Sequence, residues 1–150
     1  MSEKVINEKF ENILSQEKHV IIEKLGKPLV STPSFLVYQK NNKWMVIFFK
    51  DMLDKKVMKS QISAIAFYND DLSLAWCKGI NPLSNAQEIV NNDTNDIKSF
   101  VGKYGIPHAQ YGEMNTSLYY LTDNGCFLIA NCEKNKIVDV KLVKLSELAS

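Results

Sequence analysis

The chain of 150 residues contains no arginine, so all 18 of its basic residues are lysine. Arginine is the side chain that binds phosphates and guanine edges with two parallel hydrogen bonds, and its absence disfavours a protein that reads nucleic-acid sequence. The formal net charge of +1 indicates no strong attraction to nucleic acid or to an anionic membrane. We therefore expect neither a nucleic acid nor a membrane as a partner.

Glycine and histidine are also scarce, with 6 and 2 residues. No glycine falls in a GxGxxG or GxxxxGK[ST] pattern, which argues against nucleotide binding through a glycine-rich loop. The cysteines and histidines form no CxxC, HxxxH or HExxH pattern. The sequence therefore predicts no metal site and no cofactor.

The cysteines, Cys77, Cys126 and Cys132, are odd in number. We expect three free thiols and a reducing, cytoplasmic setting. The N-terminus lacks the apolar stretch of a signal peptide, and no apolar run reaches membrane-spanning length. The longest such run, residues 44–49, has the length of a strand.

His108, Cys126 and Asp123 are the one combination close in sequence that offers a base, a nucleophile and a carboxylate. His108 follows a proline that ends a helix, where an exposed loop histidine is the ordinary outcome. We therefore predict no catalytic residue and no enzyme. A small hydrolase that uses His108 is the one concrete enzymatic alternative.

Apolar periodicity predicts two helices and then antiparallel strands in the first half. The first helix carries Ile6, Phe10, Ile13 and Leu14 on one face. The second is expected to have Ser15 as its N-cap and Glu17 in its first turn, and to end at Gly26 and Pro28. Expected next are a hairpin of residues 35–38 and 44–49, joined by Asn41-Asn42, and strands over residues 62–68 and 72–77.

The same order restarts after residue 82. Ser84 and Gln87 form a capping box, and Thr94 is expected to cap a helix that has Asp96 in its first turn. Gly105 and Pro107 end this helix. The turn Asn124-Gly125 predicts a second hairpin, of residues 118–121 and 127–130, and residues 137–143 form a last strand.

The two halves align at a constant offset. Adding 79 takes Ser15 to Thr94, Glu17 to Asp96, Gly26 to Gly105 and Pro28 to Pro107. After a three-residue insertion the offset is 82, which takes Leu36 to Leu118, Tyr38 to Tyr120 and Ile47 to Ile129. We therefore predict an α+β fold in one compact domain. It consists of two tandem copies, about residues 1–78 and 79–150, of a helix-helix-then-antiparallel-strands unit with its helices packed on one face of the sheet.

The motifs Leu25-Gly26-Lys27-Pro28 and Tyr104-Gly105-Ile106-Pro107, each followed by strands, carry a resemblance. The pattern resembles the tandem fold of β-lactamase inhibitory protein and the single-copy small outer-membrane assembly lipoproteins that share the unit. This chain departs from those secreted families in its lack of a signal peptide, a lipoprotein cysteine and evident disulfide pairs. The resemblance implies a protein that holds another protein against its sheet, and no family contact residue carries over.

Pairing through the two predicted turns sorts the strand residues by face. The drier face is expected to pack on the helices. The other mixes aromatic and polar groups as an interface does, and on it we place the candidate partner-binding residues Tyr38, Lys40, Phe49, Tyr120 and Phe127. The alternatives are that the repeats fold over this face, or that it is an ordinary half-wet sheet.

The predicted function is a non-enzymatic protein-binding module, such as a cytosolic inhibitor or a toxin-immunity protein. Its partner is another protein of unknown identity. A secretion chaperone for an effector protein is the alternative, ranked lower because such chaperones usually end in a helix, whereas the last element predicted here is a strand.

Overall fold

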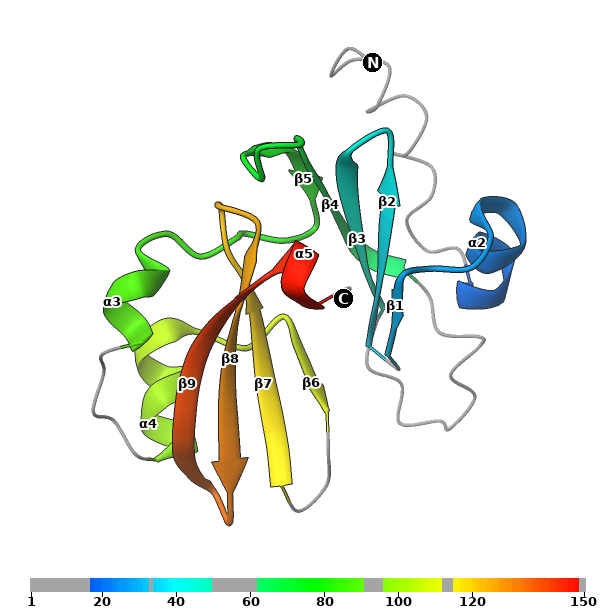
Figure 1. Ribbon diagram of the computed structural model, residues 1–150. Coiled ribbons are helices and arrows are strands. Elements are labelled where there is room, and N and C mark those ends of the chain that lie inside the picture. Colours follow the sequence, from blue (N-terminus) through cyan, green and yellow to red (C-terminus); the bar gives the residue numbers. More distant parts are fainter. Residues whose placement is uncertain (1–16, 33, 50–61, 91–95, 112–114, 149–150) are drawn as a thin grey trace. The chain divides into compact units, whose positions relative to one another are not determined.

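The computed structural model describes residues 17–32, 34–49, 62–90, 96–111 and 115–148 (Figure 1). It is α+β, with two antiparallel sheets and few helices among these residues. They fall into two compact units, one within residues 1–81 and one within residues 82–148. The predicted first helix, residues 6–14, lies outside the described residues. No helix in the described part of the chain is long and apolar enough to cross a membrane.

The described residues of the first unit form helix α2 and a five-stranded antiparallel sheet in the order β1-β2-β3-β4-β5. The elements are α2 (Lys18–Leu25), β1 (Val30–Ser31), β2 (Phe35–Lys40), β3 (Lys43–Phe49), β4 (Ile62–Tyr68) and β5 (Leu74–Lys78). The predicted turn at Asn41-Asn42 is confirmed, because both residues have positive φ, 55° and 64°. The predicted strand over residues 62–68 coincides with β4, and the short β1 was not predicted.

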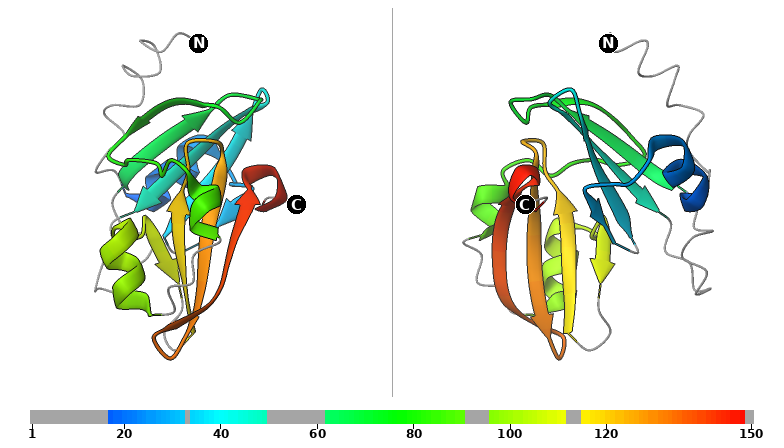
Figure 2. Two further views of the ribbon diagram at one scale, coloured as in Figure 1. Left: turned by 90° about the vertical axis from the view of Figure 1, so that its left-hand side faces the viewer. Right: turned by 45° about the vertical axis from the view of Figure 1, so that its right-hand side comes forward.

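The second unit has two helices, a four-stranded antiparallel sheet in the order β6-β7-β8-β9 and a short final helix (Figure 2). The elements are α3 (Ala86–Val90), α4 (Ile97–Tyr104), β6 (Ala109–Tyr111), β7 (Asn115–Leu121), β8 (Cys126–Glu133), β9 (Lys136–Lys144) and α5 (Leu145–Leu148). Figure 1 shows β6 and β9 as the two edge strands of this sheet. The sequence predicted β7, β8 and β9 but neither β6 nor α5.

Helices α2 and α4 each begin later than predicted. Their N-cap residues are Glu17 and Asp96, not Ser15 and Thr94. The Asp96 carboxylate accepts a hydrogen bond of 3.0 Å from the Ser99 N–H, which satisfies one of the unpaired donors of the first helical turn. The acidic residues assigned to the first turn are therefore the caps, and they are 79 residues apart.

Thr122, which follows β7, pairs with Cys126, the first residue of β8, and closes a loop of three residues, 123–125, in place of the predicted two-residue turn. The Thr122 N–H donates to the Cys126 carbonyl oxygen at 3.0 Å, and Gly125 supplies the positive φ of 71° that this loop requires. The pairing of β7 with β8 is therefore one residue out of the predicted register. Leu118 lies opposite Ala130, whereas Leu36 lies opposite Ile47. By pairing, the counterpart of Ile47 is thus Ala130 and not Ile129.

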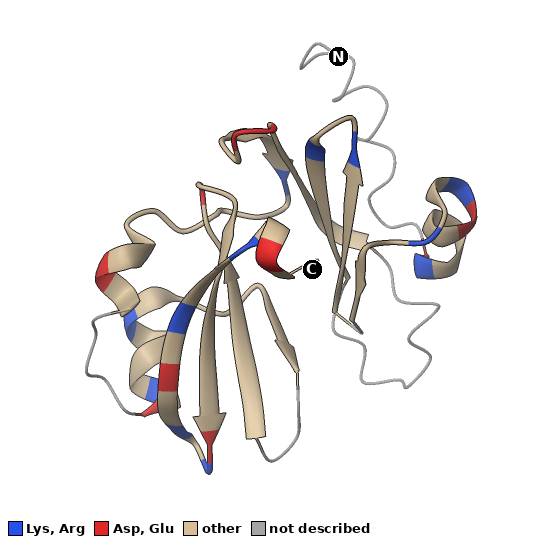
Figure 3. Ribbon diagram, viewed as in Figure 1, with Lys and Arg blue, Asp and Glu red and all other residues tan. Residues whose placement is uncertain are grey.

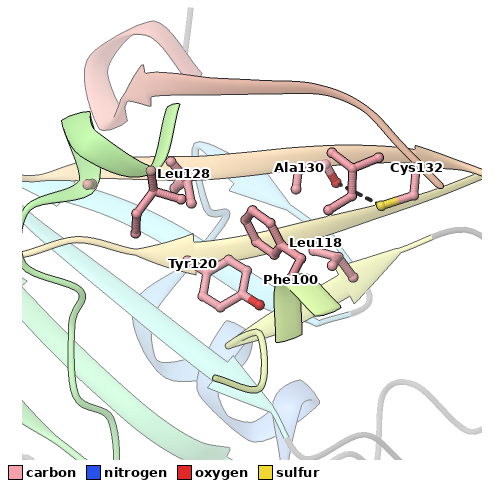
Figure 4. Packing of buried hydrophobic residues seen from close by; sticks show 9 residues of the cluster. Phe100, Leu118, Tyr120, Leu128, Ala130 and Cys132 are labelled. Carbon is pink, nitrogen blue, oxygen red and sulfur yellow. Dashed lines mark hydrogen bonds between the residues drawn. The ribbon is translucent and has the colours of Figure 1, made fainter. Parts of the chain in front are cut away.

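Each unit has its own apolar cluster in which helix residues meet one face of the sheet. In the first unit the buried cluster joins α2 to β2, β3 and β4 through Ile21, Leu36, Tyr38, Met45, Ile47, Phe49, Ile62 and Ile65. In the second it joins α3 and α4 to β7, β8 and β9 through Ala86, Ile89, Phe100, Leu118, Tyr120, Leu128, Ala130, Cys132 and Ile137 (Figure 4). We call these sheet faces the helix faces. Burial of these clusters is the main source of stability, at roughly 25 cal/mol per Å² of apolar area.

Candidate binding surface

A tyrosine on the second strand of each unit is bonded to the end of the preceding helix. The Tyr38 hydroxyl donates to the Gly26 carbonyl oxygen at 2.8 Å, and the Tyr120 hydroxyl donates to the Gly105 carbonyl oxygen at 2.7 Å. Both glycines have positive φ, 85° and 97°, and stop their helices in the same way. Burial raises the pKa of Tyr38 and raises the pKa of Tyr120 to about 12.

These glycines lie in two short segments, residues 25–32 and 104–111, here called the connecting segments. Each runs from the last residue of a helix through the adjacent edge strand. The far end of each is held by its sheet. The Leu29 N–H donates to the Val37 carbonyl oxygen and the His108 N–H to the Tyr119 carbonyl oxygen, both at 2.9 Å. Each connecting segment is therefore fixed at both ends, by a tyrosine hydroxyl and by a strand ladder.

The first connecting segment has an additional anchor in Lys18. This lysine is only 3% exposed, its ammonium group donates to the Thr32 carbonyl oxygen at 2.7 Å, and Nζ lies 5.3 Å from the centre of the Phe49 ring. Burial lowers its pKa. The burial of Lys18 was not predicted, although Lys18 stands three residues before Ile21 on the apolar face of α2, where a charged residue is unusual.

Large apolar side chains are exposed along the connecting segments. Leu25, Leu29, Ile106 and Tyr111 are 38%, 51%, 81% and 58% exposed, and Val138 is the fifth large hydrophobic in the described residues that is exposed to this extent. Single exposed apolar residues are ordinary on protein surfaces. Four of these five residues lie on the connecting segments, two in each unit.

The predicted partner-binding residues do not share one open face. Tyr38, Phe49 and Tyr120 are buried in the helix-face clusters, and Lys40 is exposed next to the β2–β3 turn. Phe127 is buried on the opposite face, where its ring lies 5.9 Å from that of Tyr119. The predicted assignment of the two faces was therefore wrong.

Two physical features caused this error. The three-residue loop moves every residue of β8 to the other face relative to Tyr120, because side chains alternate along a strand. The tyrosine hydroxyls, which suggested a wet surface, are instead satisfied inside each unit by the carbonyl groups of Gly26 and Gly105.

His108 accepts a backbone hydrogen bond at the end of β7. Its Nδ1 atom accepts a hydrogen bond of 2.8 Å from the Leu121 N–H, and its ring lies 5.8 Å from that of Tyr120. The Leu121 carbonyl oxygen accepts from the Leu83 N–H at 2.8 Å. In the neutral imidazole the proton is therefore on Nε2, and the Nδ1 lone pair is used by the fold.

The cysteines Cys77, Cys126 and Cys132 are free, as predicted. Burial raises the pKa of all three thiols, which lowers the fraction of reactive thiolate at neutral pH. The Cys126 thiol donates to the Asn124 carbonyl oxygen at 3.8 Å. Within the described ranges, no group of three His, Cys, Asp or Glu side chains has the geometry of a metal site.

Comparison with known proteins gives no match: no family model, curated protein or solved structure is similar to this chain. The resemblance to β-lactamase inhibitory protein therefore stays a prediction from the two Gly-x-Pro motifs. The functional argument has to come from the geometry of the connecting segments.

Proposed function

We propose that the chain consists of two tandem copies of one unit. Four correspondences support this. The N-caps Glu17 and Asp96, and the helix-ending glycines, are 79 residues apart, and the two anchoring tyrosines are 82 apart. The edge strands also correspond, because Val30 lies opposite Val37 as Ala109 lies opposite Tyr119.

We further propose that the protein is a non-enzymatic protein-binding module, a cytosolic inhibitor or toxin-immunity protein. The observation that carries the proposal is the exposure of Leu25, Leu29, Ile106 and Tyr111 on two connecting segments whose ends are both hydrogen-bonded. An apolar side chain on a pre-ordered backbone binds a partner with a smaller entropic cost than one on a loop that has to be ordered on binding.

Lysines beside these apolar residues suggest the chemistry of the partner. Lys24 and Lys103 occupy the last turns of α2 and α4, again 79 residues apart, and Lys27 follows Gly26 (Figure 3). All three are exposed. The proposed partner is therefore a protein with an apolar patch rimmed by carboxylates, and its association should slow down as ionic strength rises.

The proposal is tested by affinity capture from the native organism, followed by measurement of the dissociation constant with the purified partner. Leu29→Ser and Ile106→Ser should each weaken binding by about tenfold or more, as expected for residues that contribute to a hot spot. Gln87→Ser is the control, because Gln87 is exposed on α3 and lies outside both the connecting segments and β9. Equal effects of all three substitutions, or none from the first two, would contradict the proposal.

A further inference from the structure

Strand β9 is an edge strand of the second sheet, and among the described strands it pairs with β8 alone. It is nine residues long and pairs with β8 on one side. The Leu145 N–H donates a hydrogen bond of 3.0 Å to the Gly125 carbonyl oxygen. This bond shows which residues of β9 direct their backbone groups toward β8. Since inward and outward backbone groups alternate along an edge strand, the N–H and C=O groups of Val140 and Leu142 point away from β8.

The pattern of charges on β9 limits which strand can pair there. Asp139, Lys141 and Lys144 are exposed, and Figure 3 shows one acidic position between basic ones along the strand. A β-bulge at Val138 distorts the edge, and lysines on an edge strand oppose indiscriminate pairing. Near the start of β9 the edge is already occupied, because Asp96 bridges to Lys136. Among the described residues, no strand or bridge pairs with the outer edge of residues 138–144.

We propose that β9 pairs with β9 of a second copy of this chain, antiparallel, with Val140 opposite Val140 of the partner copy. In this register the backbone N–H and C=O groups of Val140 that point away from β8 form hydrogen bonds with the same groups of the partner copy's Val140. Asp139 then lies opposite the partner copy's Lys141, and Lys141 opposite its Asp139, so two opposite-charge pairs flank the two-fold axis. The register one residue along would place the two copies of Lys141 opposite each other, and like charges there disfavour it.

Two observations on the side chains support this register. The Asn131 side chain donates to the Asp139 carboxylate at 3.2 Å and accepts from the Ser117 hydroxyl at 2.7 Å, so the carboxylate is held in place before any partner arrives. Val138 is 57% exposed and belongs to neither connecting segment. The same register places it opposite Leu142 of the partner copy, which gives this exposed side chain a neighbouring strand.

Charge reversal and its rescue test the proposal, with sedimentation equilibrium on the full-length chain as the measurement. The wild type should show a monomer–dimer equilibrium. Asp139→Lys and Lys141→Asp should each weaken the dimer by about tenfold, because each replaces two attractive pairs by two repulsive ones. The double variant D139K/K141D restores the complementarity and should return to within about threefold of the wild-type dissociation constant.

Lys134→Asp is the matched control, since it changes the net charge as Lys141→Asp does but lies in the turn before β9. It should leave the dimer unchanged, and unfolding curves should show that all variants fold. A chain that stays monomeric at every concentration overturns the proposal. A dimer that is indifferent to both single reversals, or a double variant no tighter than the single ones, overturns it as well.

Discussion

The Tyr120 hydroxyl donates a hydrogen bond of 2.7 Å to the carbonyl oxygen of Gly105, the residue that ends α4. The ring of Tyr120 packs edge-on against Phe100 of the same helix, with centroids 5.9 Å apart. One side chain thus ties the helix, the strand and the start of the connecting segment together. Tyr38 makes the same bond to Gly26 in the first unit.

The first prediction follows from this bond. Tyr120→Phe removes the hydroxyl and keeps the ring, so the free energy of unfolding should fall by about 1 kcal/mol. Tyr120→Ala also removes the ring and should cost about 3–5 kcal/mol. Chemical denaturation measures both values. Equal losses for Phe and Ala would show that the ring contributes little to the core.

The second prediction concerns alkaline pH. Below pH 10 the Tyr120 hydroxyl is protonated in both the folded and the unfolded chain, and its contribution to the free energy of unfolding is at its maximum. Between the unfolded value of 10.0 and the folded pKa of about 12, only the unfolded chain releases the proton. The free energy of unfolding should therefore fall by up to about 1.4 kcal/mol per pH unit from this group.

The variant Tyr120→Phe isolates that contribution. Burial also raises the pKa of Tyr38 and Tyr119, and it lowers the pKa of Lys18, which acts in the opposite direction on stability. These groups are common to both proteins and cancel in the difference. Parallel stability curves for wild type and variant between pH 9 and pH 12 would mean that Tyr120 ionises normally.

The third prediction concerns Gly79, which follows β5. It has a φ of 81°, and a Cβ atom placed there would lie 2.4 Å from the backbone carbonyl oxygen of Ser63. Gly79→Ala should therefore destabilise the first unit by more than about 1 kcal/mol. Gly102→Ala is the control, because Gly102 lies in α4 with open space around it, and alanine there should stabilise by about 1 kcal/mol. Thermal unfolding of both variants is the measurement. Equal changes in melting temperature would contradict the backbone conformation described for Gly79.

The fourth prediction assigns a structural role to His108. His108→Leu leaves the Leu121 N–H without its acceptor and should cost about 1–3 kcal/mol of stability. In His108→Asn the amide oxygen can take the place of Nδ1, so this variant should recover part of the loss. Denaturation curves of the three proteins provide the measurement. If Asn is no better than Leu, the hydrogen bond to Nδ1 is not what stabilises this edge.

Local signals in the sequence predicted the main strands well. The paired asparagines Asn41 and Asn42 fixed the register of the first hairpin, because both residues adopt the positive φ of a two-residue turn. Asn124-Gly125 is the stronger turn motif by composition, yet Thr122 closes a three-residue loop through its backbone and its hydroxyl. This choice depends on side-chain hydrogen bonds that composition does not reveal, and it moved the residues of β8 to the other face relative to Tyr120.

The candidate surface was less predictable than the fold. Exposure of Leu29 and Ile106 depends on where the chain runs after Gly26 and Gly105, which tertiary hydrogen bonds decide. The repeat offset was visible because it rests on caps and helix stops, which are local. The burial of Lys18 could not be predicted from local sequence, because the carbonyl oxygen that accepts its hydrogen bond belongs to Thr32, 14 residues away.

Site-specific photo-cross-linking tests the central claim, binding of a protein partner through the connecting segments, most directly. A photoreactive amino acid is placed at Ile106 in one variant and at Glu88, an exposed residue of α3, in another. Illumination in cells of the native organism should yield one defined adduct with a partner protein from position 106 and none from position 88. Adducts at both positions, or at position 88 alone, would contradict the account.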